Sequence, residues 1–183
     1  MVRASVWVMT VGSVVLVVNA ARAADDAPAQ GPELRRLQPF VGAWRTETNY
    51  RPIEWAPQGG KGKGYMTGRW TLNGSFLNTE YHSTGNTGPY SGASMFTYDE
   101  KKQAYRLWWF DSRGGGQEFS GQWNEASRSF VLQSKGTDPR DRPVVKRVTY
   151  RLIGEKKILV TLEYAYTNGN FKPYIETTYT KIN

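Results

Sequence analysis

From Tyr65 to the C-terminus, apolar and polar residues alternate in short segments that are separated by turn-forming residues. The dipeptides Asn73-Gly74 and Asn168-Gly169 are strong signals for two-residue β-hairpin turns. Because successive side chains of a strand point to opposite faces, this alternation gives each strand one core face and one solvent face. Ten strand segments are predicted in the whole chain, with turn signals every ~8–12 residues, a spacing typical of a β-sandwich or barrel. The pattern therefore predicts an all-β domain built from antiparallel hairpins.

The two hairpin turns also predict which side chains point inward. Pairing around the first turn sets Trp70 opposite Leu77, with both on the apolar face. Pairing around the last turn sets Tyr164 opposite Pro173 on the apolar face and leaves Tyr174 on the polar one. We expect the apolar faces to form the interior.

The orientation of Arg147 and Arg151 depends on the turn at residues 154–157. A four-residue loop would place both arginines inside, where a guanidinium can bind a ligand carboxylate. A three-residue loop pairs Arg147 with Glu163 across the strands and turns both arginines outward. We favour the outward register because it matches opposite charges, and burial of unpaired guanidinium groups costs several kcal/mol each.

The N-terminal segment, residues 1–23, has the anatomy of a secretory signal peptide. A basic start is followed by a mostly apolar run from Val6 to Val18 and by the cleavage signal Ala21-Arg22-Ala23. The run is shorter than the ~20 residues that a membrane-spanning helix needs. We therefore predict export to the periplasm or beyond the cell, with no membrane span after cleavage. Residues 24–33 are predicted to be a disordered linker, and residues 34–183 the folded domain.

A short helix is expected before the first strand, because Leu34, Leu37 and Phe40 recur every three residues. A short helix, a Gly-x-Trp motif and a run of hairpins together resemble the lipocalin-like (calycin) barrels. The motifs Phe40-Val41-Gly42-Ala43-Trp44, Gly68 to Leu77, Tyr98-Asp99 and Trp109-Phe110-Asp111 resemble one bacterial calycin-like family, known as domain of unknown function fifteen seventy-nine. The resemblance covers residues 34–182. It implies a single up-and-down barrel of about ten strands with the helix at its closed end, and it brings no established activity.

Composition narrows the classes of partner. The formal net charge is +8, and loss of Arg3 and Arg22 with the signal peptide lowers it to +6 (8 − 2). The basic residues are dispersed and form no stripe interleaved with aromatics, so we expect no nucleic-acid partner. The chain has no cysteine, which excludes disulfides. Aromatic residues make up 14% of the chain, which fits either a large core or a ligand cavity.

Sequence motifs for chemistry are sparse. His82 is the single histidine, and no Gly-x-Ser-x-Gly or His-Glu-x-x-His motif is present, so we predict no metal site and no cofactor. The predicted pairing puts His82 opposite Tyr65 on the polar face. The glycine-rich stretch at residues 52–64 lacks the Ser or Thr of a phosphate-binding loop and is predicted to be a flexible loop.

Three functional hypotheses follow. The favoured one is a binding protein that holds a small apolar or amphipathic molecule in an aromatic-lined lumen, without catalysis. A barrel enzyme that uses Asp111 and Tyr105 as acid and base is the second, and a protein that acts through its loops, with an exposed apolar patch near Trp55, is the third. The candidate ligand-binding residues are Trp70, Tyr105, Trp109, Asp111, Trp123, Tyr164, Arg147 and Arg151.

Overall fold

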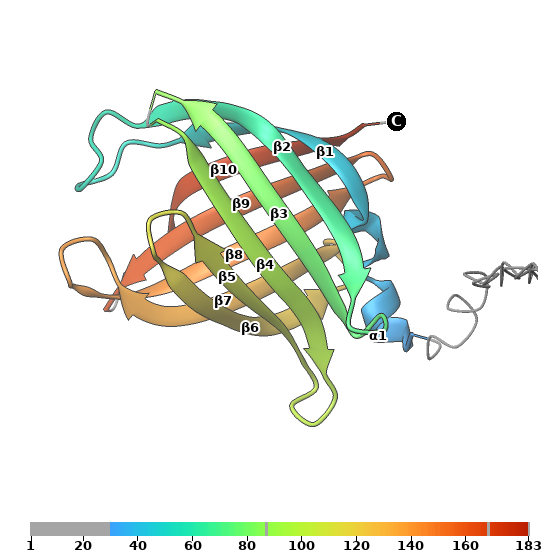
Figure 1. Ribbon diagram of the computed structural model, residues 1–183. Coiled ribbons are helices and arrows are strands. Elements are labelled where there is room, and N and C mark those ends of the chain that lie inside the picture. Colours follow the sequence, from blue (N-terminus) through green and yellow to red (C-terminus); the bar gives the residue numbers. More distant parts are fainter. Residues whose placement is uncertain (1–29, 87, 168, 183) are drawn as a thin grey trace, which may run out of the picture.

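The computed structural model describes residues 30–86, 88–167 and 169–182, so the predicted signal peptide and most of the linker lie outside the described residues. Two short helical segments, α1 (Pro32–Arg35) and η1 (Gln38–Phe40), precede ten strands. The strands are β1 (Gly42–Tyr50), β2 (Gly60–Thr71), β3 (Phe76–Gly85), β4 (Tyr90–Asp99), β5 (Ala104–Asp111), β6 (Gly116–Asn124), β7 (Ser129–Thr137), β8 (Pro143–Ile153), β9 (Lys157–Tyr166) and β10 (Lys172–Lys181). Each strand pairs antiparallel with the next, and β1 pairs with β10 to close the barrel (Figure 1). The predicted up-and-down barrel is confirmed.

The predicted faces of the central hairpins are confirmed by the strand registers. Trp70 lies opposite Leu77, and Tyr65 lies opposite His82. On β8 and β9, Arg147 lies opposite Glu163, which is the outward register. Alternation along each strand therefore fixes which residues enter the lumen.

The glycine-rich stretch before Tyr65 was predicted to be a loop up to Gly64, and this prediction is wrong. Strand β2 begins at Gly60. A Cβ atom on Gly64 would lie 1.9 Å from the carbonyl oxygen of His82, so only glycine permits this approach of β3. The low strand propensity of glycine is thus overridden by the close packing of two strands.

The last hairpin differs from its prediction at one point. The register of β10 against β9 shifts between Pro173 and Ile175, so Tyr164 lies opposite Lys172 instead of Pro173. The shift is a β-bulge, which bends a strand and redirects a side chain. Tyr174, predicted to face solvent, instead packs with its ring centre 5.8 Å from that of Tyr164.

One end of the barrel is closed by the helical segments (Figure 1). Leu37, Phe40 and Trp44 are buried there, at 0%, 2% and 0% exposure. The indole Nε1 of Trp44 donates to the carbonyl oxygen of Phe40 at 3.1 Å, and Nε1 of Trp70 donates to Oε1 of Gln38 at 2.8 Å. The loop between β1 and β2 lies at the opposite end (Figure 1). Neither helical segment of the described chain has the length and apolar content to traverse a bilayer.

Candidate functional site

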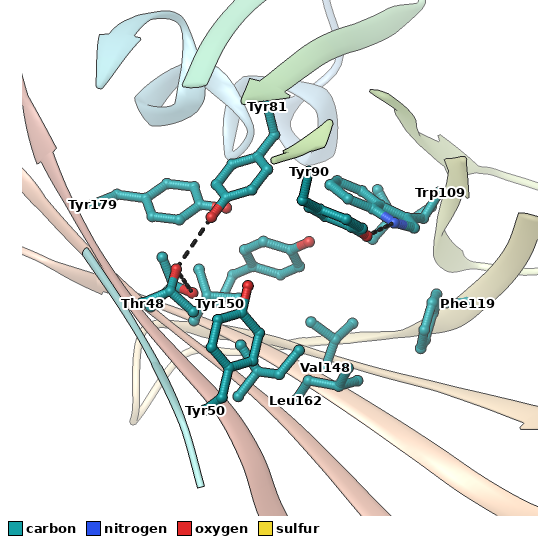
Figure 2. Close-up of a pocket in the computed structure, with 14 residues that line it drawn as sticks. Thr48, Tyr50, Tyr81, Tyr90, Trp109, Phe119, Val148, Tyr150, Leu162 and Tyr179 are labelled. Carbon is teal, nitrogen blue, oxygen red and sulfur yellow. Dashed lines mark hydrogen bonds between the residues drawn. The ribbon is translucent and has the colours of Figure 1, made fainter. Parts of the chain in front are cut away.

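A cavity of about 140 Å³ lies inside the barrel, in the half away from α1. The residues that line it are Thr48, Tyr50, Tyr81, Tyr90, Leu107, Trp109, Phe119, Val148, Tyr150, Val160, Leu162, Ile175, Thr177 and Tyr179 (Figure 2). Every lining residue is apolar, aromatic or a threonine, and none carries a charge. A cavity with this lining suits an apolar body with a few hydrogen-bonding atoms.

Hydrogen bonds fix part of the tyrosine wall. The hydroxyls of Tyr81 and Thr48 lie 3.1 Å apart, and Thr48 is also bonded to Thr177 at 3.0 Å (Figure 2). On the other side, Nε1 of Trp109 donates to the Tyr90 hydroxyl at 3.2 Å. These contacts hold the rings that shape the cavity and satisfy part of the hydrogen-bonding capacity of their hydroxyls.

Other phenol groups in the cavity have no such partner. The hydroxyls of Tyr50, Tyr150 and Tyr179 form no hydrogen bond with any residue in the described ranges. Tyr179 is only 8% exposed, so solvent reaches it poorly. Among the described residues, Thr46 Oγ1 is the one side-chain polar atom that is both fully buried and without a partner, so these three hydroxyls keep some surface toward the cavity, where water or a ligand atom can bind. These groups are therefore available to a ligand.

The same phenols are unsuited to proton transfer near neutral pH. Burial raises the pKa of Tyr50 to about 12 and raises the pKa values of Tyr90, Tyr150 and Tyr179 above the usual range. A general acid or base works best with a pKa near the working pH. The tyrosines of the cavity therefore act as neutral hydrogen-bonding groups.

The candidate residues from the sequence separate into different regions. Trp109 lines the cavity, whereas Tyr105, Trp123 and Trp70 lie toward the closed end. The Tyr105 hydroxyl donates to the carbonyl oxygen of Glu33 at 3.0 Å, so it fastens α1 to the barrel.

Asp111 and Tyr105, the proposed acid–base pair, are not brought together. Both point inward from β5, but six residues apart, which is roughly 20 Å along a strand. The Asp111 carboxylate instead accepts hydrogen bonds from the backbone N–H groups of Arg113 at 2.9 Å and Gly115 at 3.2 Å. It thereby caps the turn after β5, and the Tyr90 hydroxyl donates to its other oxygen at 3.4 Å.

Arg147 and Arg151, two of the candidate ligand-binding residues, lie on the outer surface, as the favoured register predicts. The guanidinium of Arg147 donates to both carboxylate oxygens of Glu163, at 2.7 and 3.0 Å, and Arg151 is exposed. The inward-facing cation on β8 is instead Lys146, which lies opposite Tyr164 near the open end. Sequence reasoning missed it, although its place between the inward-facing Val144 and Val148 indicates the same face.

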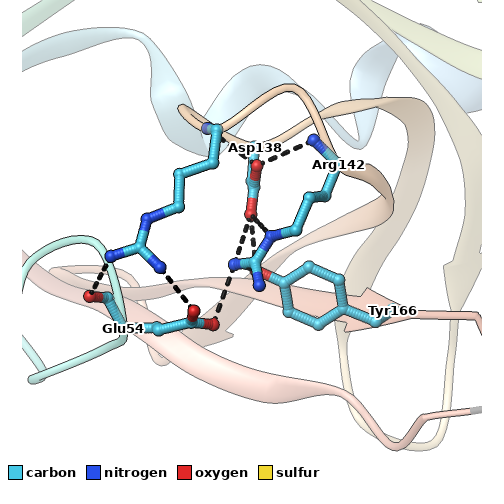
Figure 3. Close-up of polar contacts among 5 residues, drawn as sticks. Glu54, Asp138, Arg142 and Tyr166 are labelled. Carbon is cyan, nitrogen blue, oxygen red and sulfur yellow. Dashed lines mark hydrogen bonds and ion pairs between the residues drawn. The ribbon is translucent and has the colours of Figure 1, made fainter.

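The open end is partly covered by the loop between β1 and β2. The ring centre of Trp55 lies 5.2 Å from that of Tyr164 and 6.1 Å from that of Tyr174. Next to it, Glu54 forms ion pairs with Arg140 and, at 2.8 Å, with Arg142, both in the loop between β7 and β8 (Figure 3). Trp55 is thus half-buried against tyrosines, not presented as an exposed patch.

Asp138 fixes the conformation of the loop between β7 and β8 (Figure 3). Its side chain has no exposed surface and accepts hydrogen bonds from the backbone N–H groups of Arg140 and Arg142 and from the Tyr166 hydroxyl. Burial alone would raise the pKa of this carboxyl, but the hydrogen bonds from Arg142 and Tyr166 outweigh it and hold the pKa well below its usual range. The charged form of Asp138 therefore stabilises this corner.

His82 lies on the outside of the barrel. Its ring stacks on Tyr65 at 5.0 Å between centroids, and its Nδ1 is 3.0 Å from the Ser91 hydroxyl. Within residues 30–86, 88–167 and 169–182, no three His, Cys, Asp or Glu side chains gather in a way that would hold a metal ion.

A closed barrel of ten up-and-down strands, with a short helix over one end and an aromatic-lined lumen, is a lipocalin-like barrel of the calycin type. Residues 29–181 match the family described as protein of unknown function (DUF1579). The chain belongs to this family. No curated protein matches the sequence at a significant level.

Solved structures with the same fold are distant in sequence. The crystal structure of Rv2717c from M. tuberculosis superposes with a TM-score of 0.61 at 13% identity, covering 85% of this chain and 100% of that one. The S-type phycobiliprotein lyase CPES from Guillardia theta superposes with a TM-score of 0.54 at 10% identity, covering 84% of this chain and 99% of that one. At these identities the matches establish a shared barrel fold.

Proposed function

We propose that the mature protein binds one small apolar or amphipathic molecule in the open half of its barrel, in the periplasm or outside the cell. The observation that carries this proposal is the cavity of about 140 Å³, whose wall is uncharged and in which the hydroxyls of Tyr150 and Tyr179 form no hydrogen bond with the described residues. Its volume is close to the ~150 Å³ of an engineered protein cavity that binds benzene. The buried part of the ligand is therefore about one ring in size.

The placement of the ionisable groups favours binding over catalysis. The phenols of the cavity have raised pKa values, and the carboxylate of Asp111 serves the turn after β5. Asp111 accepts a hydrogen bond from the cavity residue Tyr90 at 3.4 Å, but Asp111 does not line the cavity and burial raises the pKa of Tyr90 above its usual range, whereas proton transfer needs a pKa near the working pH. Export is supported by the sequence of residues 1–23.

Native mass spectrometry tests the proposal. The full chain, with its own residues 1–23, is expressed in a bacterium that has a periplasm and is recovered from that compartment. We expect a protein that starts at Ala24 and carries a small-molecule adduct. Leu162→Trp, which fills the cavity, should lose the adduct, whereas Leu159→Trp, on the outer face of the same strand, should keep it.

Two results would contradict the proposal. One is a wild-type protein that is free of small molecules and also takes up none of a panel of single-ring aromatic compounds. The other is an adduct that persists unchanged in Leu162→Trp, because that would place the bound molecule outside the lumen. Recovery of the uncleaved chain in the cytoplasm would contradict the predicted export alone.

A further inference from the structure

The lumen contains a cation that the uncharged cavity does not explain. Lys146 points inward from β8, one inward position nearer the open end than the cavity residue Val148. Its Nζ donates to Oε1 of Gln117 at 2.7 Å and lies 5.8 Å from the ring centre of Tyr164. A Cβ atom built on Gly136 would lie 3.7 Å from this Nζ, so the ammonium group sits between β6, β7 and β9 above the cavity.

This ammonium group has no carboxylate partner. In the described part of the chain, no ion pair includes Lys146, and its polar contact is to a neutral amide. Burial lowers the pKa of the lysine, while the negative charge of Asp138 acts in the opposite direction. Asp138 itself is bound by Arg142 and Tyr166. An incompletely solvated, unpaired ammonium group gains free energy from an anion.

The other polar groups at the open end of the barrel already form contacts of their own or lie farther from Lys146. The amide nitrogen of Gln117 donates to the Ser134 hydroxyl at 2.8 Å, so its oxygen is held toward Lys146. Asp111 caps its own turn, and the guanidinium of Arg113 stacks over Tyr90 at 5.5 Å. Arg113 also has no ion pair in the described chain, but it lies over Tyr90 of β4, whereas Lys146 is the unpaired cation that points inward from β8. An apolar cavity with an unpaired ammonium group beside it is an arrangement that can bind an amphiphilic anion.

We propose that the ligand is a compact amphiphile whose carboxylate binds the ammonium group of Lys146 and whose apolar part fills the cavity. This inference rests on the proposed binding function and specifies its ligand class. Adjacent inward positions on a strand are roughly 7 Å apart. A ligand with one ring and a short acid chain can therefore reach from the cavity beside Val148 to the ammonium group of Lys146.

Isothermal titration with a matched pair of probes tests the inference. The probes are 3-phenylpropanoate and its neutral amide, 3-phenylpropanamide. The wild type should bind the carboxylate at least about ten-fold more tightly, as expected for a charge-assisted hydrogen bond. In Lys146→Met the carboxylate affinity should fall to that of the amide, and the amide affinity should not change. Lys146→Arg should keep the preference, as should Lys135→Met, which removes an exposed lysine on neighbouring β7.

The possible outcomes separate the two proposals. Equal binding of both probes by the wild type, or a preference that survives in Lys146→Met, overturns the anion site while leaving the lumen as a binding site. Failure of both probes to bind the wild type counts against the binding function itself, and the anion site falls with it. If Lys146→Met does not fold, Lys146→Gln, which keeps a donor toward Gln117, carries the same prediction.

Discussion

Replacement of Phe130 by alanine should destabilise the barrel severely. Phe130 has no exposed surface, and its ring centre lies 4.7 Å from Trp123, 4.8 Å from Tyr105, 5.4 Å from Phe96 and 5.8 Å from Phe40. It is therefore the central residue of the aromatic cluster that fills the half of the barrel next to α1. It does not line the cavity.

The size of the effect follows from these contacts. Truncation of a fully buried phenylalanine to alanine costs about 3–5 kcal/mol, a large share of the ~5–15 kcal/mol that stabilises a typical domain. Phe130→Leu keeps most of the apolar burial and loses the ring pairs, which are worth ~0.5–1.5 kcal/mol each. We therefore expect it to cost roughly half as much as the alanine variant.

Urea unfolding, monitored by far-UV circular dichroism, measures the free energy of unfolding of both variants. Titration with 3-phenylpropanamide measures the affinity of the cavity for a ligand. The amide affinity of Phe130→Leu should stay within about two-fold of the wild type, because Phe130 does not line the cavity and leucine keeps an apolar side chain beside its cross-strand neighbour Tyr150, which does line it. A cost below ~1 kcal/mol for Phe130→Ala would refute the description of a packed closed half. A large loss of affinity in Phe130→Leu would show that the shape of the cavity depends on the ring of Phe130.

Two further predictions concern individual side chains. Tyr81→Phe should cost about 1 kcal/mol because it removes the hydroxyl bonded to Thr48, whereas Tyr150→Phe should change stability by less than ~0.5 kcal/mol, since that hydroxyl has no partner in the described chain. Urea unfolding of both variants tests this, and an equal cost for the two would contradict it. The pKa of Asp138 is lowered on folding, so its charge stabilises the fold above its unfolded pKa of about 4, and this contribution is lost as the pH falls toward the folded value. Wild type should therefore lose more stability than Asp138→Asn between about pH 7 and about pH 3, and parallel pH profiles would show that the carboxylate has no such role.

Much of the fold could be predicted from the sequence because alternation is a local signal. The outward position of Arg147 followed from pairing opposite charges, and the structure has it opposite Glu163. The stretch from Phe40 to Trp44 was correctly placed at the joint between helix and barrel, since a buried indole and its carbonyl acceptor sit there.

The incorrect predictions concern positions where tertiary packing, and not the local sequence pattern, determines the secondary structure or the face of a side chain. Gly64 was assigned to a loop by its propensity, but the approach of β3 requires a residue without Cβ in the strand. Tyr174 was assigned to the outer face by strict alternation, which a β-bulge interrupts. A hairpin turn signal gives the register only up to the first irregularity of the strand.

For the candidate site, the direction of a side chain could be predicted more readily than the space around it. Trp109, a candidate ligand-binding residue from the sequence, lines the cavity, and Lys146 lies on an inward position that the alternation of the strand indicates. That the barrel is filled around Tyr105 but hollow around Trp109 depends on side chains from several strands, which no local pattern contains. The sequence therefore predicts which residues face the lumen, but the volume of the cavity can be obtained only from the structure.

The hollow half has a physical origin in the sizes of facing side chains. Thr48 and Thr177 stand beside each other on β1 and β10, where their small side chains face the rings that the other strands contribute to the cavity. The volume left between them is apolar, yet the hydroxyls of Tyr150 and Tyr179 open into it without partners. A hydrocarbon that displaced water from these hydroxyls would leave both unsatisfied, at roughly 1–3 kcal/mol each. The ligand that suits this lumen therefore carries a hydrogen-bonding atom near the tyrosines as well as an anionic group toward Lys146.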